Sequence, residues 1–180
     1  MESILDNLTK EEVKVLVDRY PFLKPYNVFS GELPDNYDYE YIFPLEIPVG
    51  WERMFLQMCE DIRQPLIDCD FLDKFRLVQC KEKFAELRVY HNGAPKKVCD
   101  IIAKYEQMSY YICSQCGKPA EYITSGWMIP LCGDCYDKLK NPKCEKIEFQ
   151  DYYFNSTWRD GKEIVEKISF KNEWDRYIKG

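Results

Sequence analysis

The sequence predicts an α+β fold, in which a small antiparallel sheet and about three helices pack around an embedded module that contains four cysteines. Three stretches carry apolar residues at helical spacing, and two pairs of stretches alternate apolar and polar residues as strands do. Two Cys-x2-Cys pairs also stand close together in the chain. We expect three parts packed as one domain: an α+β body over 1–111, the cysteine module over 112–140, and a C-terminal β-hairpin with a short helix over 141–180.

The first helix is predicted over residues 9–20. Thr9 and Glu12 form the capping-box pattern, in which each side chain accepts a hydrogen bond from the backbone N–H of the other residue. The apolar stripe of this helix consists of Val13, Leu16, Val17 and Tyr20. Pro21 then stops the helix, because proline has no backbone N–H to donate.

Two further helices belong to the body. Gly50 opens the second helix, and we expect Pro65 to kink or end it. Its apolar stripe consists of Trp51, Met54, Phe55, Met58, Cys59 and Ile62. Pro95 suits the first turn of the third helix. The buried face of that helix is predicted to hold Val98, Ile101, Ile102, Tyr105 and Met108.

Two strand pairs are predicted. Residues 75–90 alternate apolar and polar side chains and form a two-stranded unit between the second and third helices. Residues 147–154 and 163–170 form the second pair, with Asp160-Gly161 as a turn signal between them.

Residues 21–48 are predicted to be ordered but irregular. They contain five prolines and seven aromatic residues, and a flexible linker would not hold so many aromatics. This segment has two interpretations, which are a partner-binding surface and a loop that fills the edge of the core.

Composition places the chain among globular proteins of the cytoplasm. Its 180 residues are 16% aromatic, which provides the bulk for a core. No stretch approaches the roughly 20 apolar residues of a membrane span, and the N-terminus lacks the features of a secretory signal. We therefore expect a cytoplasmic protein without a membrane partner.

The net charge of −6 is concentrated at the start of the chain. Residues 1–72 hold 6 basic and 15 acidic groups, a net of −9. Phosphate binding depends on Lys and Arg, so this surface is unsuited to nucleic acid. It suits a basic protein partner, although solubility alone also explains such a charge.

The four cysteines of the module have the spacing of a zinc site. Cys113 and Cys116 are followed, after 15 residues, by Cys132 and Cys135, which fits two knuckles holding one ion. We expect Gly117 and Gly133 to supply the positive φ angles of the two turns. The intervening residues read as a hairpin and the following ones as a helical turn, which is the order of a zinc ribbon or treble clef. Zn²⁺ bound tetrahedrally by four thiolates has no open position, so the ion is predicted to be structural.

Other uses of these cysteines fit less well. Disulfides are rare in a reducing compartment, and a redox pair normally has a thioredoxin-like βαβ setting. An iron–sulfur cluster also uses four thiolates, but with other typical spacings. The remaining cysteines are predicted to be small core residues at Cys59, Cys69, Cys80 and Cys99, while Cys144 is either a spare ligand or an ordinary thiol.

The sequence offers no recognisable catalytic constellation. His91 is the only histidine and lies in a turn-like His-Asn-Gly stretch, where we expect it at the surface. Phosphate-binding glycine motifs are missing too. We therefore expect a non-enzymatic protein with no evident small-molecule substrate, and an enzyme with an unrecognised site is the third hypothesis.

One basic concentration lies within residues 74–97. Aromatic residues stand among its cations, as in proteins that hold single-stranded nucleic acid, but acidic residues interrupt it. The candidate nucleic-acid-binding residues are Lys81, Lys83, Arg88, Lys96 and Lys97.

The order of motifs from Gly50 to Cys135 resembles a known family. A Gly-Trp pair opens a helix, VQCKEKFAELRVY follows at Val78–Tyr90, and the two cysteine knuckles come next. Small uncharacterised proteins of phages and prophages carry a similar KEKFGGLRFY-like strand signature ahead of a zinc-knuckle module (CxxC…CxxC/H). The resemblance covers roughly half of the chain and implies a phage-encoded accessory protein that acts inside a bacterium. It transfers no activity.

This chain departs from that family at two places. Cys135 stands where family members tend to have histidine, which preserves zinc binding. Ala85 and Glu86 replace the usual glycines of the strand turn.

The first function hypothesis is a zinc-stabilised accessory protein that binds a host or phage protein and modulates host processes or defence. The alternative is a nucleic-acid-binding protein that uses residues 74–97 and the zinc module.

Overall fold

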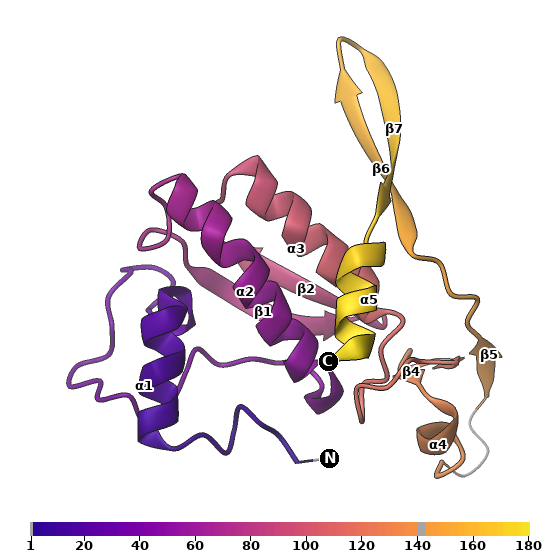
Figure 1. The fold of residues 1–180 in the computed structure, drawn as a ribbon, viewed down its shortest axis with the longest axis horizontal. Coiled ribbons are helices and arrows are strands. Elements are labelled where there is room, and N and C mark those ends of the chain that lie inside the picture. Colours follow the sequence, from indigo (N-terminus) through magenta and orange to yellow (C-terminus); the bar gives the residue numbers. More distant parts are fainter. Residues whose placement is uncertain (1, 140–142) are drawn as a thin grey trace.

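The computed structural model describes residues 2–139 and 143–180 and shows the α+β fold that the sequence predicts (Figure 1). Within these ranges there are five α-helices and three small antiparallel sheets. The helices are α1 (Lys10–Arg19), α2 (Glu52–Asp68), α3 (Lys96–Ser109), α4 (Gly133–Tyr136) and α5 (Lys171–Lys179). The strands are β1 (Leu77–Lys83), β2 (Glu86–His91), β3 (Tyr122–Thr124), β4 (Pro130–Leu131), β5 (Cys144–Lys146), β6 (Tyr152–Arg159) and β7 (Lys162–Ser169).

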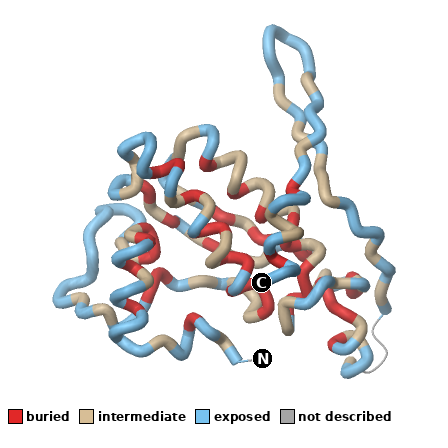
Figure 2. Tube along the Cα trace, viewed as in Figure 1, coloured by how far each residue is buried: buried red, intermediate tan, exposed pale blue. Residues whose placement is uncertain are grey.

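The core lies where α1, α2 and α3 meet the β1–β2 hairpin. Buried residues concentrate in this region, whereas the long loop beside α1 and the tip of the β6–β7 hairpin are exposed (Figure 2). The stripes predicted for α2 and α3 are on the buried side, although Ile101 is only half-buried. The largest fully buried side chains of the body include Trp51, Phe55, Phe75 and Tyr105.

The capping box of α1 is confirmed. The Thr9 hydroxyl accepts a hydrogen bond from the Glu12 N–H, and the Thr9 N–H donates to the Glu12 carboxylate at 2.8 Å. The helix ends at Arg19, and Pro21 begins a single 3-10 turn, so the predicted stop is also correct.

The expectation that Pro65 could end α2 is wrong. The helix continues through Pro65 to Asp68. Proline removes one helical hydrogen bond, but here the ring is buried beside Leu66 on the face that packs into the core. Apolar burial near the end of the helix offsets that loss.

The β1–β2 hairpin has a two-residue turn at Phe84 and Ala85. Lys83 pairs with Glu86, and both turn residues have positive φ, at 54° and 65°, as a type I′ turn requires. The resemblance to the phage and prophage proteins predicts the altered turn at Ala85 and Glu86, whereas Glu86 is already the first residue of β2. Glu82 stabilises the turn by accepting a hydrogen bond from the Ala85 N–H at 2.8 Å.

Both edges of this hairpin are covered by other parts of the chain. On the β2 side, the backbone N–H groups of Leu87 and Val89 donate to the Ser109 hydroxyl and the Glu106 carboxylate of α3. On the β1 side, the backbone of Glu46 exchanges hydrogen bonds with residues of β1.

The C-terminal hairpin is present, with its turn at Asp160-Gly161 as predicted. Its first strand starts at Tyr152, later than expected. The hairpin extends away from the body (Figure 1), and α5 then returns to it. There Glu173 forms an ion pair with Lys104 at 2.8 Å, and the Tyr177 side chain is buried.

The irregular segment is anchored at both ends and exposed in its middle. Phe22, Leu23, Ile42 and Phe43 are buried in the core, and the Phe43 N–H donates to the Leu23 carbonyl at 2.7 Å. Most of residues 27–41 are exposed. Among the residues that the structure describes, no helix has the length and apolar character needed to cross a membrane.

Candidate metal centre

The two knuckles come from different local structures. Cys113 and Cys116 lie in the turn that follows α3, while Cys132 caps α4 and Cys135 lies within it. The β3–β4 hairpin connects the knuckles, so the predicted order of knuckle, hairpin and knuckle is correct, whereas the predicted position of the helix is wrong. The helix α4 is a single turn that begins before Cys135, not after it.

The sheet of the module extends past residue 140. Strand β5 pairs with β3, with Cys144 opposite Thr124. Residues 144–146, which the sequence places in the C-terminal part without predicting a strand, therefore complete a three-stranded sheet in the order β4-β3-β5.

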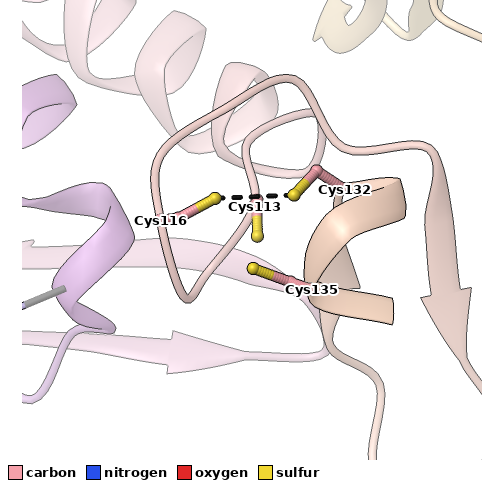
Figure 3. A group of neighbouring side chains, drawn as sticks. All are labelled: Cys113, Cys116, Cys132 and Cys135. Carbon is pink, nitrogen blue, oxygen red and sulfur yellow. Dashed lines mark hydrogen bonds between the residues drawn. The ribbon is translucent and has the colours of Figure 1, made fainter. Parts of the chain in front are cut away.

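The four sulfur atoms converge on one point. Figure 3 shows the side chains of Cys113, Cys116, Cys132 and Cys135 directed toward a shared space. All four Sγ atoms lie within 4.8 Å of one another, and those of Cys116 and Cys132 are 3.5 Å apart. Four thiolates about 2.3 Å from a tetrahedral ion would be about 3.8 Å from each other. These cysteines can therefore hold one metal ion.

Only one of the two glycines has the expected conformation. Gly117 has φ of +74°, as the first turn requires. The expectation for Gly133 is wrong, because this residue is the first of α4 and has no positive φ. Its N–H instead donates to the Glu121 carboxylate at 3.1 Å, which places a negative charge at the start of the helical turn.

The thiols respond differently to their surroundings. Burial opposes ionisation of Cys116, but hydrogen bonds from the Lys118 N–H and from neighbouring thiols hold its pKa below the usual value. Burial raises the pKa of the Cys132 and Cys135 thiols, and neighbouring thiols contribute to this shift. A bound cation would favour the thiolate form of all four.

The module has little apolar core of its own. Among the residues that the structure describes, its buried cluster consists of Cys113, Leu131, Cys132 and Cys135, and partly buried Ile129, Tyr136 and Leu139 pack against it. Three of the four buried side chains are candidate metal ligands, so Leu131 is the one purely apolar member of the buried cluster. The cysteines therefore occupy the place that a hydrophobic core takes in a larger domain.

The body holds the first knuckle from two sides. On one side, the Gly50 N–H donates to the Ser114 carbonyl at 2.8 Å, and the Trp51 indole N–H donates to the Ile112 carbonyl at 2.9 Å. On the other side, the Tyr177 hydroxyl of α5 donates to the Gly117 carbonyl at 2.7 Å. The knuckle is thus fixed between the start of α2 and the last helix.

We expect Tyr177→Phe to lower the free energy of unfolding by about 1–2 kcal/mol, because the Gly117 carbonyl loses its donor while the ring stays packed. Urea denaturation of the metal-loaded protein measures this change. Tyr90→Phe, at an exposed tyrosine of β2, is the control and should change stability by less than about 0.5 kcal/mol. Equal stability of the two variants would show that this hydrogen bond does not fix the knuckle.

The candidate nucleic-acid-binding residues fall into two groups. Lys81, Lys83 and Arg88 share one face of the β1–β2 hairpin, since Lys81 pairs with Arg88 and Lys83 is two residues further along β1. Arg88 also forms an ion pair with Glu86 at 2.5 Å. Lys96 and Lys97 begin α3, beyond the opposite end of β2 from Lys83, and Lys96 forms an ion pair with Asp100.

The predicted burial of the remaining cysteines and of the histidine is only partly correct. Cys59 and Cys80 are buried as expected, but Cys99 is half-buried and Cys69 is exposed because it follows the end of α2. Cys144 lies outside the group of four that could hold a metal. The sequence places His91 at the surface, whereas its ring is half-buried against Phe75, and this burial lowers its pKa.

Sequence reasoning missed the residues that hold the module in place. The sequence predicts Gly50 only as the start of α2. In the structure, its lack of a side chain lets the backbone of the first knuckle pack directly against the start of that helix. No local pattern indicates Tyr177, because its partner Gly117 lies 60 residues earlier in the chain.

Comparison with known proteins assigns this chain to no family. The chain matches no model of a protein family, no curated protein and no solved structure.

Proposed function

We propose that this chain is a non-enzymatic binding protein of the phage accessory type, which acts in the bacterial cytoplasm and engages a protein partner. The observation that carries the proposal is an exposed acidic loop, residues 27–41, that displays a phenylalanine on an ordered turn. A zinc ion held by Cys113, Cys116, Cys132 and Cys135 is proposed to stabilise the fold. Zinc is favoured because four converging thiolates are its usual structural donor set.

The acidic loop presents Phe29 in a defined position. The Asn27 side-chain oxygen accepts hydrogen bonds from the N–H groups of Phe29 and Ser30, at 2.9 and 3.0 Å. The backbone of Asn27 also bonds to Gly31 and Glu32. Phe29 is nevertheless 96% exposed. An exposed aromatic ring on a pre-ordered turn loses little conformational entropy on binding, which is typical of an interface anchor.

The charge of this loop indicates the chemistry of its partner. Residues 27–41 contain four carboxylates, all exposed, and no Lys or Arg. They are Glu32, Asp35, Asp38 and Glu40, of which Asp38 pairs with Lys10 of α1. Such a surface attracts a basic partner and repels nucleic acid. We therefore propose a protein partner whose basic surface surrounds an apolar depression that accepts Phe29.

We expect Phe29→Ala to weaken partner binding by at least about tenfold, as loss of an interface anchor does. Because the ring is so exposed, folding should be unaffected. The measurement is affinity capture from nuclease-treated bacterial lysate, followed by titration of the captured protein. Phe154→Ala is the matched control, because Phe154 is 65% exposed on the separate β6–β7 hairpin. If both variants retained the same partners as the wild type, the acidic loop would not be the docking surface.

Nucleic-acid binding is the second candidate, supported by the position of Lys81, Lys83 and Arg88 on one strand face. Tyr90 lies on the same face, and the Lys81 ammonium is 5.5 Å from its ring centroid. Oligonucleotide binding that weakens steeply with salt, and that a Lys81→Glu/Lys83→Glu variant abolishes, would favour this function. Nuclease-insensitive capture that depends on Phe29 would favour the protein partner.

A further inference from the structure

A groove lies at the joint between the body and the metal module. It consists of two adjoining hollows of about 560 and 220 Å³, which share Glu82, Trp127 and Met128 as lining residues. Glu46 and Glu82 come from the body, whereas Trp127 and Met128 come from the β3–β4 loop of the module. We call this feature the joint groove. Because both parts line it, the groove exists only while the module is docked on the body.

Trp127 stands on a loop whose backbone is fixed. The hydroxyl of Thr124, which is buried, donates to the Trp127 carbonyl at 2.5 Å and accepts from the Ile129 N–H at 2.9 Å. Gly126, with φ of +87°, forms the turn. The indole is nevertheless 78% exposed. An amphipathic ring in a fixed position, left largely in solvent, has the properties of an interface anchor.

Phe84, at the other end of the groove, occupies an unfavourable backbone conformation. It is the first residue of the β1–β2 turn, with φ of 54°, and it is 69% exposed. Such turns favour Asn, Asp or Gly, because other L-residues are strained at positive φ. Most of the ring is exposed, and backbone strain of this kind concentrates at functional sites.

The charges of the two hollows differ. The larger hollow is lined by Glu46 and Glu82, and by no cationic residue among the described ones. One oxygen of each carboxylate accepts a hydrogen bond, from the Gln79 amide and the Ala85 N–H respectively, which leaves the second oxygen for a ligand. The smaller one contains Lys83 beside Glu82, together with the Phe84 ring. A cation therefore fits the larger hollow, where it can pair with a carboxylate and lie against Trp127. An apolar side chain fits the smaller hollow.

We propose that the joint groove binds an extended segment of a partner protein in which an arginine or lysine is adjacent to an apolar residue. The carboxylates disfavour nucleic acid as the occupant, since phosphates would be repelled. The acidic loop lies on the side of the body away from β4 (Figure 1). The joint groove is thus a second recognition site, independent of Phe29.

The first test is selection of peptides from a displayed random library on the metal-loaded wild-type protein, with counter-selection on Trp127→Ala. The expected result is enrichment of sequences with a basic residue next to an apolar one. Enrichment of acidic sequences, or of none, would overturn the proposal.

The second test measures the affinity of one selected peptide for a set of variants. Trp127→Ala should weaken binding at least about tenfold, and Glu82→Gln should weaken it severalfold while its amide oxygen still accepts from Ala85. Trp158→Ala is the matched control, since Trp158 is 72% exposed on the β6–β7 hairpin. Phe29→Ala should also leave affinity unchanged, which separates this site from the acidic loop. Equal losses for Trp127→Ala and Trp158→Ala would contradict a specific groove.

A third test uses the strain at Phe84. Asparagine tolerates positive φ, so Phe84→Asn should raise the melting temperature by about 2 °C and still weaken peptide binding at least about fivefold. A stabilised variant with unchanged peptide affinity would exclude Phe84 from the site. If Trp127→Ala weakened oligothymidylate binding instead of peptide binding, the occupant would be nucleic acid and the proposal would be wrong.

Discussion

Replacing Cys132 by serine is expected to abolish metal binding and to unfold the cysteine module. Serine supplies no thiolate, and a four-ligand structural site rarely retains its ion with three ligands. Because three of the four residues in the module's buried hydrophobic cluster are cysteines, the apolar burial that remains is small once the ion is lost. Structural zinc contributes about 10–16 kcal/mol to the folding of small domains, so the effect should be complete.

The measurements are metal content by elemental analysis and amide hydrogen exchange across residues 112–139. Cys69→Ser is the matched control, since Cys69 is exposed and does not belong to the group, and this variant should keep both its metal and its protection. A Cys132→Ser protein that retained about one ion per chain would refute the assignment of the site.

Gly50→Ala is expected to destabilise the protein by about 3 kcal/mol or more, at the upper end of overpacking effects. A Cβ atom at Gly50 would lie 2.1 Å from the Cys113 carbonyl oxygen and 2.7 Å from the Ser114 backbone. These are backbone atoms of the metal knuckle, so they cannot rotate out of the way. The substitution must therefore displace either the start of α2 or the knuckle itself.

Thermal denaturation and the rate of metal transfer to a chelator report this displacement. Gly133→Ala is a demanding control, because Gly133 adjoins a metal ligand but its added Cβ would meet only the flexible Glu121 carboxylate, at 3.2 Å. We expect that variant to remain within about 1 kcal/mol of the wild type. Comparable losses in both variants would mean that the close approach at Gly50 has no special role.

Local patterns in the sequence were sufficient to predict most of the helices, strands and turns. The capping box at Thr9 and Glu12, the turn at Asp160-Gly161 and the two cysteine pairs each involve residues a few positions apart. Their consequences depend on backbone geometry that is set within a single turn. The candidate metal site could therefore be predicted with all four ligands.

Tertiary contacts determined what the sequence did not predict. Pro65 continues a helix because its ring is buried, and Cys69 is exposed because the helix has already ended. The pairing of β5 with β3 and the contact between Tyr177 and Gly117 join residues far apart in the chain. The conformation of Gly133 depended on where α4 begins, which the cysteine spacing leaves open.

The covered edges of the β1–β2 hairpin have a consequence for how the protein behaves at high concentration. An open strand edge can recruit a strand from another molecule and start aggregation. Here Ser109 and Glu106 occupy the donors on one side, and the backbone at Glu46 occupies the other. These contacts hinder the hairpin from acting as a template for foreign strands, although among the described residues its sheet has only two strands. Helix side chains thus substitute for a neighbouring strand by accepting the hydrogen bonds of the Leu87 and Val89 N–H groups.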